Sequence, residues 1–158
     1  MTAGGGARVV AMTAAHLPAV AALCGDLGYA AEAAGVAARF AAMAKDPDHG
    51  LIVAADGEGR VIGFIHVFAR RALHAEAAAQ VLAMAVAKPH RRRGVGTLLL
   101  ARAEAWAADH GLAAMMVYSR DGRDDAHGFY AALGYRPAVG LSRYDKPLSP
   151  AAARRRKA

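Results

Sequence analysis

Cysteine and long apolar runs are both scarce in this chain of 158 residues. The single cysteine, Cys24, excludes an internal disulfide framework and a multi-cysteine metal site, and it is typical of a reducing compartment. The uncharged stretch between Arg8 and Asp26 contains His16 and Pro18 and is too weakly apolar to span a bilayer. We therefore expect a cytoplasmic protein that does not insert into a membrane.

Metal-binding patterns are also missing. The seven histidines show no HExxH or similar spacing that would bring two imidazoles to one face of a helix. The sequence therefore predicts no metal site.

The positive charge is concentrated in two short segments. Lys and Arg total 20 and Asp and Glu total 13, which gives a net charge of +7. Arg91 to Arg93 supply three of these charges and residues 154–157 supply four, so the rest of the chain is neutral. A nucleic-acid-binding protein usually spreads its basic residues over a whole face, and no aromatic residues interleave with this tail. Nucleic-acid association is therefore the weakest of the functions we consider.

The apolar pattern alternates between helix and strand periods, which indicates one mixed α/β domain over residues 1–148 and a basic, disordered tail over residues 149–158. Alanine accounts for 43 residues and favours helices and close packing. The expected helices are Thr13 to Leu27, Ala31 to Lys45, Val95 to His110 and Ala126 to Leu133. The expected strands are Arg8 to Met12, Leu51 to Ala55, Val61 to Phe68, Gln80 to Val86, Met115 to Tyr118, and a closing strand and turn within Arg136 to Lys146.

The segment Arg91-Arg92-Arg93-Gly94-Val95-Gly96 follows a strand and opens a helix. Glycines allow the backbone to turn so that several N–H groups face one point, and the helix N-terminus and the arginines add positive charge. This combination favours a pyrophosphate-binding loop. The spacing fits neither GxxxxGK[ST] nor GxGxxG, so the usual mononucleotide and dinucleotide loops are excluded. A solvated basic turn that caps the helix is the plain structural alternative.

A second motif lies downstream, in the run from Arg123 through Ala126, His127, Phe129 and Tyr130 to Leu133-Gly134-Tyr135. Together with the RxxGxG segment, this run resembles the GNAT superfamily of acetyl-CoA-dependent N-acetyltransferases. The resemblance implies a central, mostly antiparallel sheet that splays between its fourth and fifth strands and is flanked by helices. It is specific over residues 80–135, and the earlier elements agree only in their order.

The resemblance also implies where acetyl-CoA binds. The backbone N–H groups of the RxxGxG loop would hold the pyrophosphate, and the pantetheine arm would lie between the strands at 82–86 and 115–118. An N–H in the first of these strands would hydrogen-bond the thioester oxygen. The expected coenzyme-binding residues are Met84, Ala85, Val86, Arg91, Arg92, Arg93, Gly94, Val95, Gly96, Thr97, His127 and Tyr130.

The catalytic assignments implied by the resemblance are less complete. Tyr130 matches the tyrosine that protonates the departing thiolate in many members. It also lies on the apolar stripe of its expected helix, and this position is compatible with a place in the core. Where some members carry a glutamate base, this chain has Gln80. Glu76 is the expected base, with His74, His66 or solvent as alternatives.

The function expected from this resemblance is acetyl transfer from acetyl-CoA to a primary amine of a small molecule or peptide. An acetyl-CoA-binding regulator with little turnover is the alternative from another class. The sequence names neither the acceptor amine nor the oligomeric state, and a homodimer stays open.

Overall fold

The computed structural model describes residues 6–29, 31–119, 124–138, 140 and 143–148. Two compact units make up the chain, residues 1–118 and residues 119–158. In the described ranges, no helix has the length and apolar character needed to cross a membrane.

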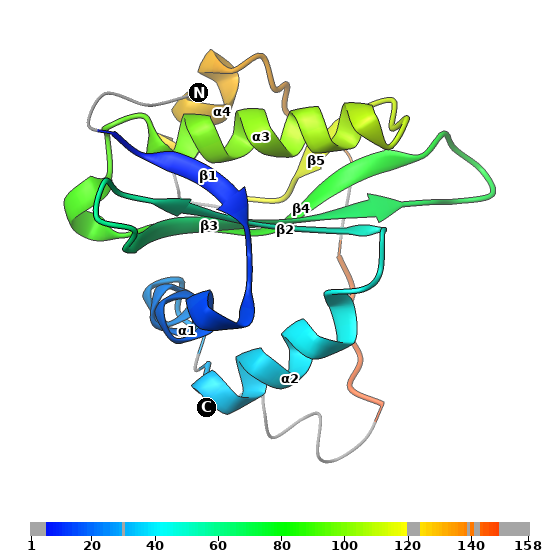
Figure 1. Cartoon of the computed structure of the whole chain (residues 1–158). Coiled ribbons are helices and arrows are strands. Elements are labelled where there is room, and N and C mark those ends of the chain that lie inside the picture. Colours follow the sequence, from blue (N-terminus) through cyan, green and yellow to red (C-terminus); the bar gives the residue numbers. More distant parts are fainter. Residues whose placement is uncertain (1–5, 30, 120–123, 139, 141–142, 149–158) are drawn as a thin grey trace. The chain divides into compact units, whose positions relative to one another are not determined.

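The first unit is built on one five-stranded sheet with the strand order β1-β2-β3-β4-β5 (Figure 1). Strands β1 to β4 pair antiparallel, and β5 runs parallel to β4 because helix α3 crosses over between them. This arrangement confirms the expected mixed α/β class. The bounds are Arg8–Ala11 for β1, His49–Ala55 for β2, Val61–Arg70 for β3, Ala78–Val86 for β4 and Met115–Val117 for β5.

The β2–β3 hairpin turns where the glycines predict it. Asp56 Oδ1 accepts hydrogen bonds from the N–H groups of Glu58 (3.0 Å) and Arg60 (2.9 Å). Gly59 takes a φ of +81°, a region that glycine occupies without a steric penalty. The carboxylate and the glycine together fix a tight turn at this end of the sheet.

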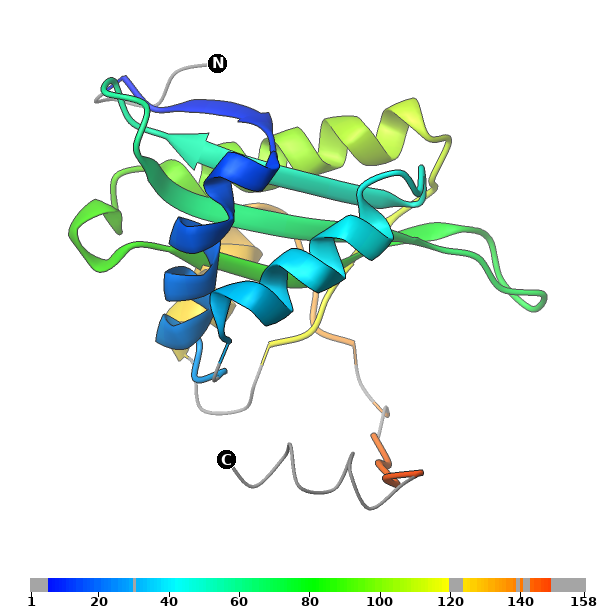
Figure 2. The ribbon, with the colours of Figure 1, turned by 60° about the horizontal axis from the view of Figure 1, so that its bottom comes forward.

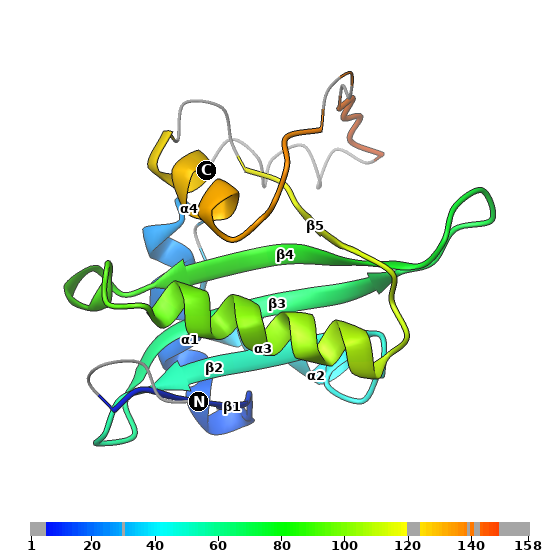
Figure 3. The ribbon, with the colours of Figure 1, turned by 90° about the horizontal axis from the view of Figure 1, so that it is seen from above.

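Helix α3 (Val95–Asp109) covers one face of the sheet (Figure 3). Leu99 and Leu100 on this helix are fully buried. A Cβ added at Gly50 would lie 2.5 Å from Cγ1 of Val67 on the neighbouring strand β3 and 3.0 Å from the indole of Trp106 on α3. The packing around residue 50 therefore leaves no room for a side chain.

Helices α1 (Leu17–Asp26) and α2 (Ala33–Met43) lie on the opposite face (Figure 2). A short 3-10 turn, η1 (Ala14–His16), leads into α1. The apolar residues of this layer pack on the sheet and form one buried cluster, which comprises Leu17, Val20, Ala21, Leu23, Val36, Val53, Phe64 and Ala85. Each helix lies inside the range that the sequence predicts for it.

Strand β4 is irregular at its middle. His66 pairs with Ala83 and Val67 pairs with Val81, so Leu82 is an extra residue and forms a β-bulge. On its other edge, β4 pairs with β5 only from Ala79 to Val81. Beyond that point the two strands separate, so the edge of residues 82–86 has no β5 partner in the described part of the chain. The expected splay between the fourth and fifth strands is thus confirmed.

The second unit contains helix α4 (Asp124–Ala132), which is followed by Gly134 at a φ of +87°. The sequence predicts a closing strand between Arg136 and Lys146, but the described residues of this segment form none. Pro137 has no N–H to donate to a ladder, and Gly140 takes a φ of +82° that a strand does not use. The basic tail at 149–158 lies outside the described residues.

Candidate functional site

The loop between β4 and α3 has an unusual backbone. It begins with a 3-10 turn, η2 (Lys88–His90), and then places Arg92 at a φ of +60° and Gly94 at +80°. Arg92 is the only non-glycine residue with a positive φ in the described residues. Left-handed residues in a loop can turn neighbouring N–H groups towards one point, as in an anion-binding nest.

Helix α3 adds further donors to this loop. Its first intrahelical hydrogen bond runs from the Leu98 N–H to the Gly94 carbonyl, 2.9 Å. The N–H groups of Val95, Gly96 and Thr97 precede that bond, so the helix supplies them with no acceptor. They lie at the positive end of the helix dipole, which favours a negative group.

Arg91 fixes the loop to the end of β4. Its Nε donates a hydrogen bond to the Val86 carbonyl over 2.9 Å. The side chains of Arg92 and Arg93 are exposed. This division of roles keeps the loop at the strand end while the two following guanidinium groups face solvent.

The open edge of β4 leads directly into this loop. Met84, Ala85 and Val86 lie on the part of β4 that β5 does not pair, and Val86 is followed within two residues by the 3-10 turn. An extended ligand that hydrogen-bonds to this edge would therefore reach the N–H groups at the start of α3. The structure brings these predicted residues together in one unit.

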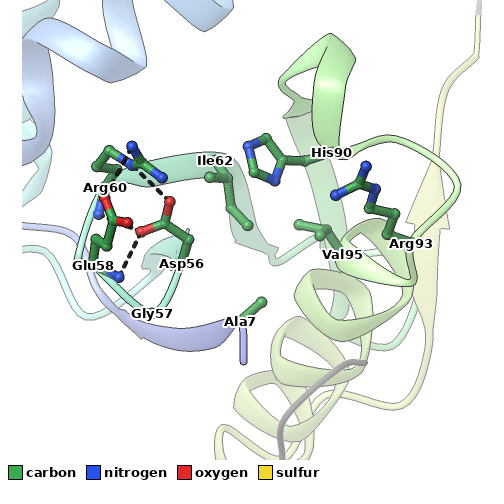
Figure 4. A pocket seen from close by; sticks show the side chains of 9 residues that line it. All are labelled: Ala7, Asp56, Gly57, Glu58, Arg60, Ile62, His90, Arg93 and Val95. Carbon is green, nitrogen blue, oxygen red and sulfur yellow. Dashed lines mark hydrogen bonds and ion pairs between the residues drawn. The ribbon is translucent and has the colours of Figure 1, made fainter. Parts of the chain in front are cut away.

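A cavity of about 280 Å³ lies beside the loop, between it and the β2–β3 turn (Figure 4). His90 and Arg93 line one side, and Asp56, Glu58 and Arg60 line the other. Arg60 Nε is 2.8 Å from Asp56 Oδ2, and this hydrogen bond lowers the pKa of the Asp56 carboxyl. Arg60 Nη1 also lies 3.0 Å from Glu58 Oε2. Arg60 thus forms ion pairs with two carboxylates. Arg93 is the other arginine that lines the cavity.

Glu76 and His74 lie away from the open edge. Both are exposed in the connection between β3 and β4, which projects beyond the sheet in Figure 3. Glu76 precedes Leu82 by six residues, which corresponds to about 20 Å along an extended strand. Gln80 is nearer, half-buried and paired with Phe68 and Met116. The structure does not bring Glu76 to the edge that the coenzyme would occupy.

Tyr130 and His127 belong to the second unit. The Tyr130 ring makes edge contacts with Phe129 and Tyr135, with centroid distances of 5.2 and 5.8 Å. His127 is exposed on the same helix. The aromatic cluster holds the Tyr130 side chain in place within its own unit.

A histidine pair on the sheet is not apparent from the sequence. His49 Nδ1 and His66 Nε2 are 2.8 Å apart and share a hydrogen bond between neighbouring strands. Burial, with a smaller contribution from His49, lowers the pKa of His66 to about 4. The two residues are 17 positions apart, and only the register of β2 on β3 could have paired them.

Among the described residues, no group of three or more His, Cys, Asp or Glu side chains is arranged to hold a metal ion.

The match to known protein families accounts for this combination of splayed strands and glycine-containing loop. The model of the acetyltransferase (GNAT) family matches residues 19–135. This chain belongs to that family, and it is an acyltransferase by class. Comparison with curated protein sequences gives no significant match.

Solved structures with the same fold include two aminoglycoside N-acetyltransferases. One is described as an aminoglycoside N-acetyltransferase in complex with CoA, with 18% identity, a TM-score of 0.80, and coverage of 90% of this chain and 96% of that one. The other is an aminoglycoside 6′-N-acetyltransferase from Acinetobacter baumannii, with 16% identity, a TM-score of 0.78, and coverage of 91% and 100%. A protein described as a transcriptional regulator from Bacillus halodurans C-125 is also similar, at 21% identity, a TM-score of 0.76, and coverage of 88% and 99%. At these identities the likeness establishes the fold.

Proposed function

We propose that this protein transfers an acetyl group from acetyl-CoA to a primary amine of a small molecule or peptide. The observation that carries the proposal is the continuity between the unpaired edge of β4 at residues 82–86 and the N–H groups at the start of α3. An edge strand recognises an extended amide-containing chain, and a helix N-terminus recognises a phosphate. The pantetheine arm and the pyrophosphate of acetyl-CoA present these two features in that order.

In this proposal, the N–H groups from Gly94 to Thr97 bind the pyrophosphate, and Arg92 and Arg93 add positive charge. The pantetheine amides pair with β4 and with residues 115–118. An N–H within Met84–Val86 donates to the thioester oxygen, where negative charge develops as the amine attacks.

The proposed reaction is a direct transfer. The amine lone pair attacks the thioester carbon, a C–N bond forms, and the C–S bond breaks. The thiolate takes a proton from the Tyr130 hydroxyl, since a phenol is a suitable proton donor to a thiolate that is held close to it. The amine nitrogen must lose a proton, and the Gln80 amide cannot accept one at neutral pH.

An assay of CoA thiol release tests the proposal. The purified chain is incubated with acetyl-CoA and with an aminoglycoside, a polyamine or a lysine-containing peptide, and the acetylated product is identified by its mass. We expect amine-dependent thiol release with at least one class of amine. Saturable acetyl-CoA binding without release for any of them would instead support a coenzyme-binding regulator. No binding at all would overturn both functions.

A further inference from the structure

The histidine pair lies on the sheet face that carries α1 and α2. His66 alternates along β3 with Phe64, which belongs to the buried cluster under α1, and with Phe68. The ring centroids of His49 and Phe68 lie 4.8 Å apart, so the two histidines and Phe68 share this face. Val67 points to the opposite face, towards Trp106 of α3, as the close approach at Gly50 shows.

This part of the face is accessible. Leu82 is 46% exposed although it lies in the middle of a nine-residue strand, and His66, Gln80 and Ala83 are only partly buried. His66 lies directly opposite Ala83, next to the bulge where the edge of β4 becomes unpaired. Neighbouring strands are about 4.8 Å apart, and the open edge lies on the far side of β4 from β3, so a chain bound there is two strand spacings, about 10 Å, from the backbone of His66.

The neighbours of the two imidazole rings favour one placement of their protons. Asp46 Oδ1 accepts the Asp48 N–H over 2.9 Å, and its Oδ2 lies 3.9 Å from His49 Nε2. A carboxylate at that position favours a proton on His49 Nε2. A neutral His49 then has an unprotonated Nδ1, which accepts the hydrogen bond from His66 Nε2 over 2.8 Å. In a neutral His66, this leaves Nδ1 with a free lone pair.

We propose that His66, His49 and Asp46 form a proton relay for the acceptor amine. The proposal rests on the proposed acetyl transfer and names the route that the amine proton takes. A short chain of waters connects the amine to His66 Nδ1 and passes the proton to it. The Nε2 proton of His66 moves to His49 Nδ1. The Nε2 proton of His49 passes through water to Asp46, because Oδ2 is 3.9 Å away and outside direct hydrogen-bond reach, and the half-exposed carboxyl returns it to solvent. Both rings then return to their Nε2–H forms by proton exchange with water before the next turnover.

The surroundings of His66 favour transfer over storage of the proton. Leu51 and Ala83 lie opposite it on the two neighbouring strands, and Phe68 and Gln80 follow on the same face; none of these side chains ionises near neutral pH. At the same corner of the sheet, Asp48 is paired with Arg71 over 3.2 Å. A relay needs no stable imidazolium, so the low pKa of His66, about 4, is compatible with this role.

The first test is independent of activity. Nitrogen-15 NMR of the imidazoles in the full chain at pH 7 reports which ring nitrogen of each histidine is protonated. We expect Nε2–H in both His49 and His66. Asp46→Asn should disturb the His49 tautomer, whereas Asp48→Asn, which removes the neighbouring carboxylate, should leave it unchanged. An Nδ1–H form of His66 in the wild type would overturn the relay.

The second test is kinetic, with spermine as the acceptor if it is acetylated and otherwise with the best amine from the thiol-release assay. At pH 7 we expect His49→Gln and His66→Asn to lower kcat about 100-fold with the KM for acetyl-CoA unchanged, and Asp48→Asn to keep full activity. The loss should shrink as the pH rises towards about 10.4, the ordinary pKa of a primary amine, because a growing share of the amine then loses its proton to solvent before it binds. Folded variants with wild-type kcat across this pH range would overturn the relay and leave the acetyl transfer intact. A wild type that neither binds acetyl-CoA nor releases thiol would overturn the proposed function and, with it, the catalytic use of the relay.

Discussion

At the residue scale, Tyr130 is the group whose chemistry the account depends on most. Replacement by phenylalanine keeps the ring in its cluster with Phe129 and Tyr135 and removes only the hydroxyl. We expect Tyr130→Phe to lower kcat by about 100-fold, because the thiolate loses its proton donor. The dissociation constant for acetyl-CoA should stay within about twofold, since the proposed phosphate and pantetheine contacts come from the β4–α3 loop and from the strands and do not use the Tyr130 hydroxyl.

Tyr135→Phe is the matched control, because it removes a hydroxyl from the ring that packs against Tyr130. Steady-state kinetics and calorimetric titration of both variants separate the two effects. A Tyr130→Phe variant with full kcat would contradict the acid assignment.

Arg92 tests the backbone of the loop. A non-glycine residue at a left-handed φ costs roughly 1–2 kcal/mol, and Arg92 takes a φ of +60°. Arg92→Gly and Arg92→Ala remove the same charge, but only glycine relieves the backbone. We therefore expect the free energy of unfolding in urea to be about 1 kcal/mol higher for the glycine variant than for the alanine variant. Equal values would contradict a left-handed residue 92.

Much at the element scale follows from local sequence. Asp56-Gly57-Glu58-Gly59 predicts the hairpin because its carboxylate and glycines satisfy a tight turn without help from the rest of the chain. The glycines after Arg93 predict the start of α3 in the same way. The β-bulge at Leu82 has no such signature, because it depends on how β4 aligns with β3. The His49–His66 contact depends on strand register in the same manner.

Two further interpretations show the limits of reading residue types alone. The segment from Arg136 to Lys146 contains apolar residues spaced as in a strand, but Pro137 and the positive φ of Gly140 act against a ladder. Glu76 carries the chemistry expected of a base, yet it lies in the projecting β3–β4 connection (Figure 3). Residue type indicates a role only once the register shows which side chains meet.

The packing of α3 on the sheet gives an element-scale prediction. A Cβ at Gly50 would lie 2.5 Å from Cγ1 of Val67 on β3 and 3.0 Å from Trp106 on α3, so Gly50→Ala forces these side chains to move. We expect it to lower the free energy of unfolding by about 1–3 kcal/mol. Gly57→Ala in the β2–β3 turn is the control, because no atom lies within 4 Å of its added Cβ. Urea denaturation checks both, and equal losses would contradict the close packing of Val67 and Trp106 around Gly50.

At the scale of the whole molecule, His66 links stability to pH. Its pKa is about 4 in the folded chain, against about 6.5 when unfolded. Between these values the unfolded state binds more protons, so stability is full above pH 6.5 and falls as the pH drops towards 4. The loss attributable to His66 approaches 3 kcal/mol in order of magnitude, roughly 1.4 kcal/mol for each unit of pKa difference.

Urea denaturation at pH 7.0, 5.5 and 4.5 measures this dependence in the wild type and in His66→Asn. We expect the wild type to lose more stability than the variant over this range, since carboxylates elsewhere contribute equally to both. Parallel losses in the two proteins would contradict a neutral, partly buried His66 with a lowered pKa.

The central claim is that acetyl-CoA binds along the edge of β4 and at the start of α3. Isothermal titration of the full chain with acetyl-CoA tests it most directly, beside Gly94→Val as the variant. Gly94 takes a φ of +80°, which valine cannot adopt without strain, so the substitution should rearrange the N–H groups of the loop. The account predicts one saturable site in the wild type and no measurable binding in a Gly94→Val protein whose circular dichroism shows it to be folded. Absence of binding in the wild type, or equal affinity in the variant, would contradict it.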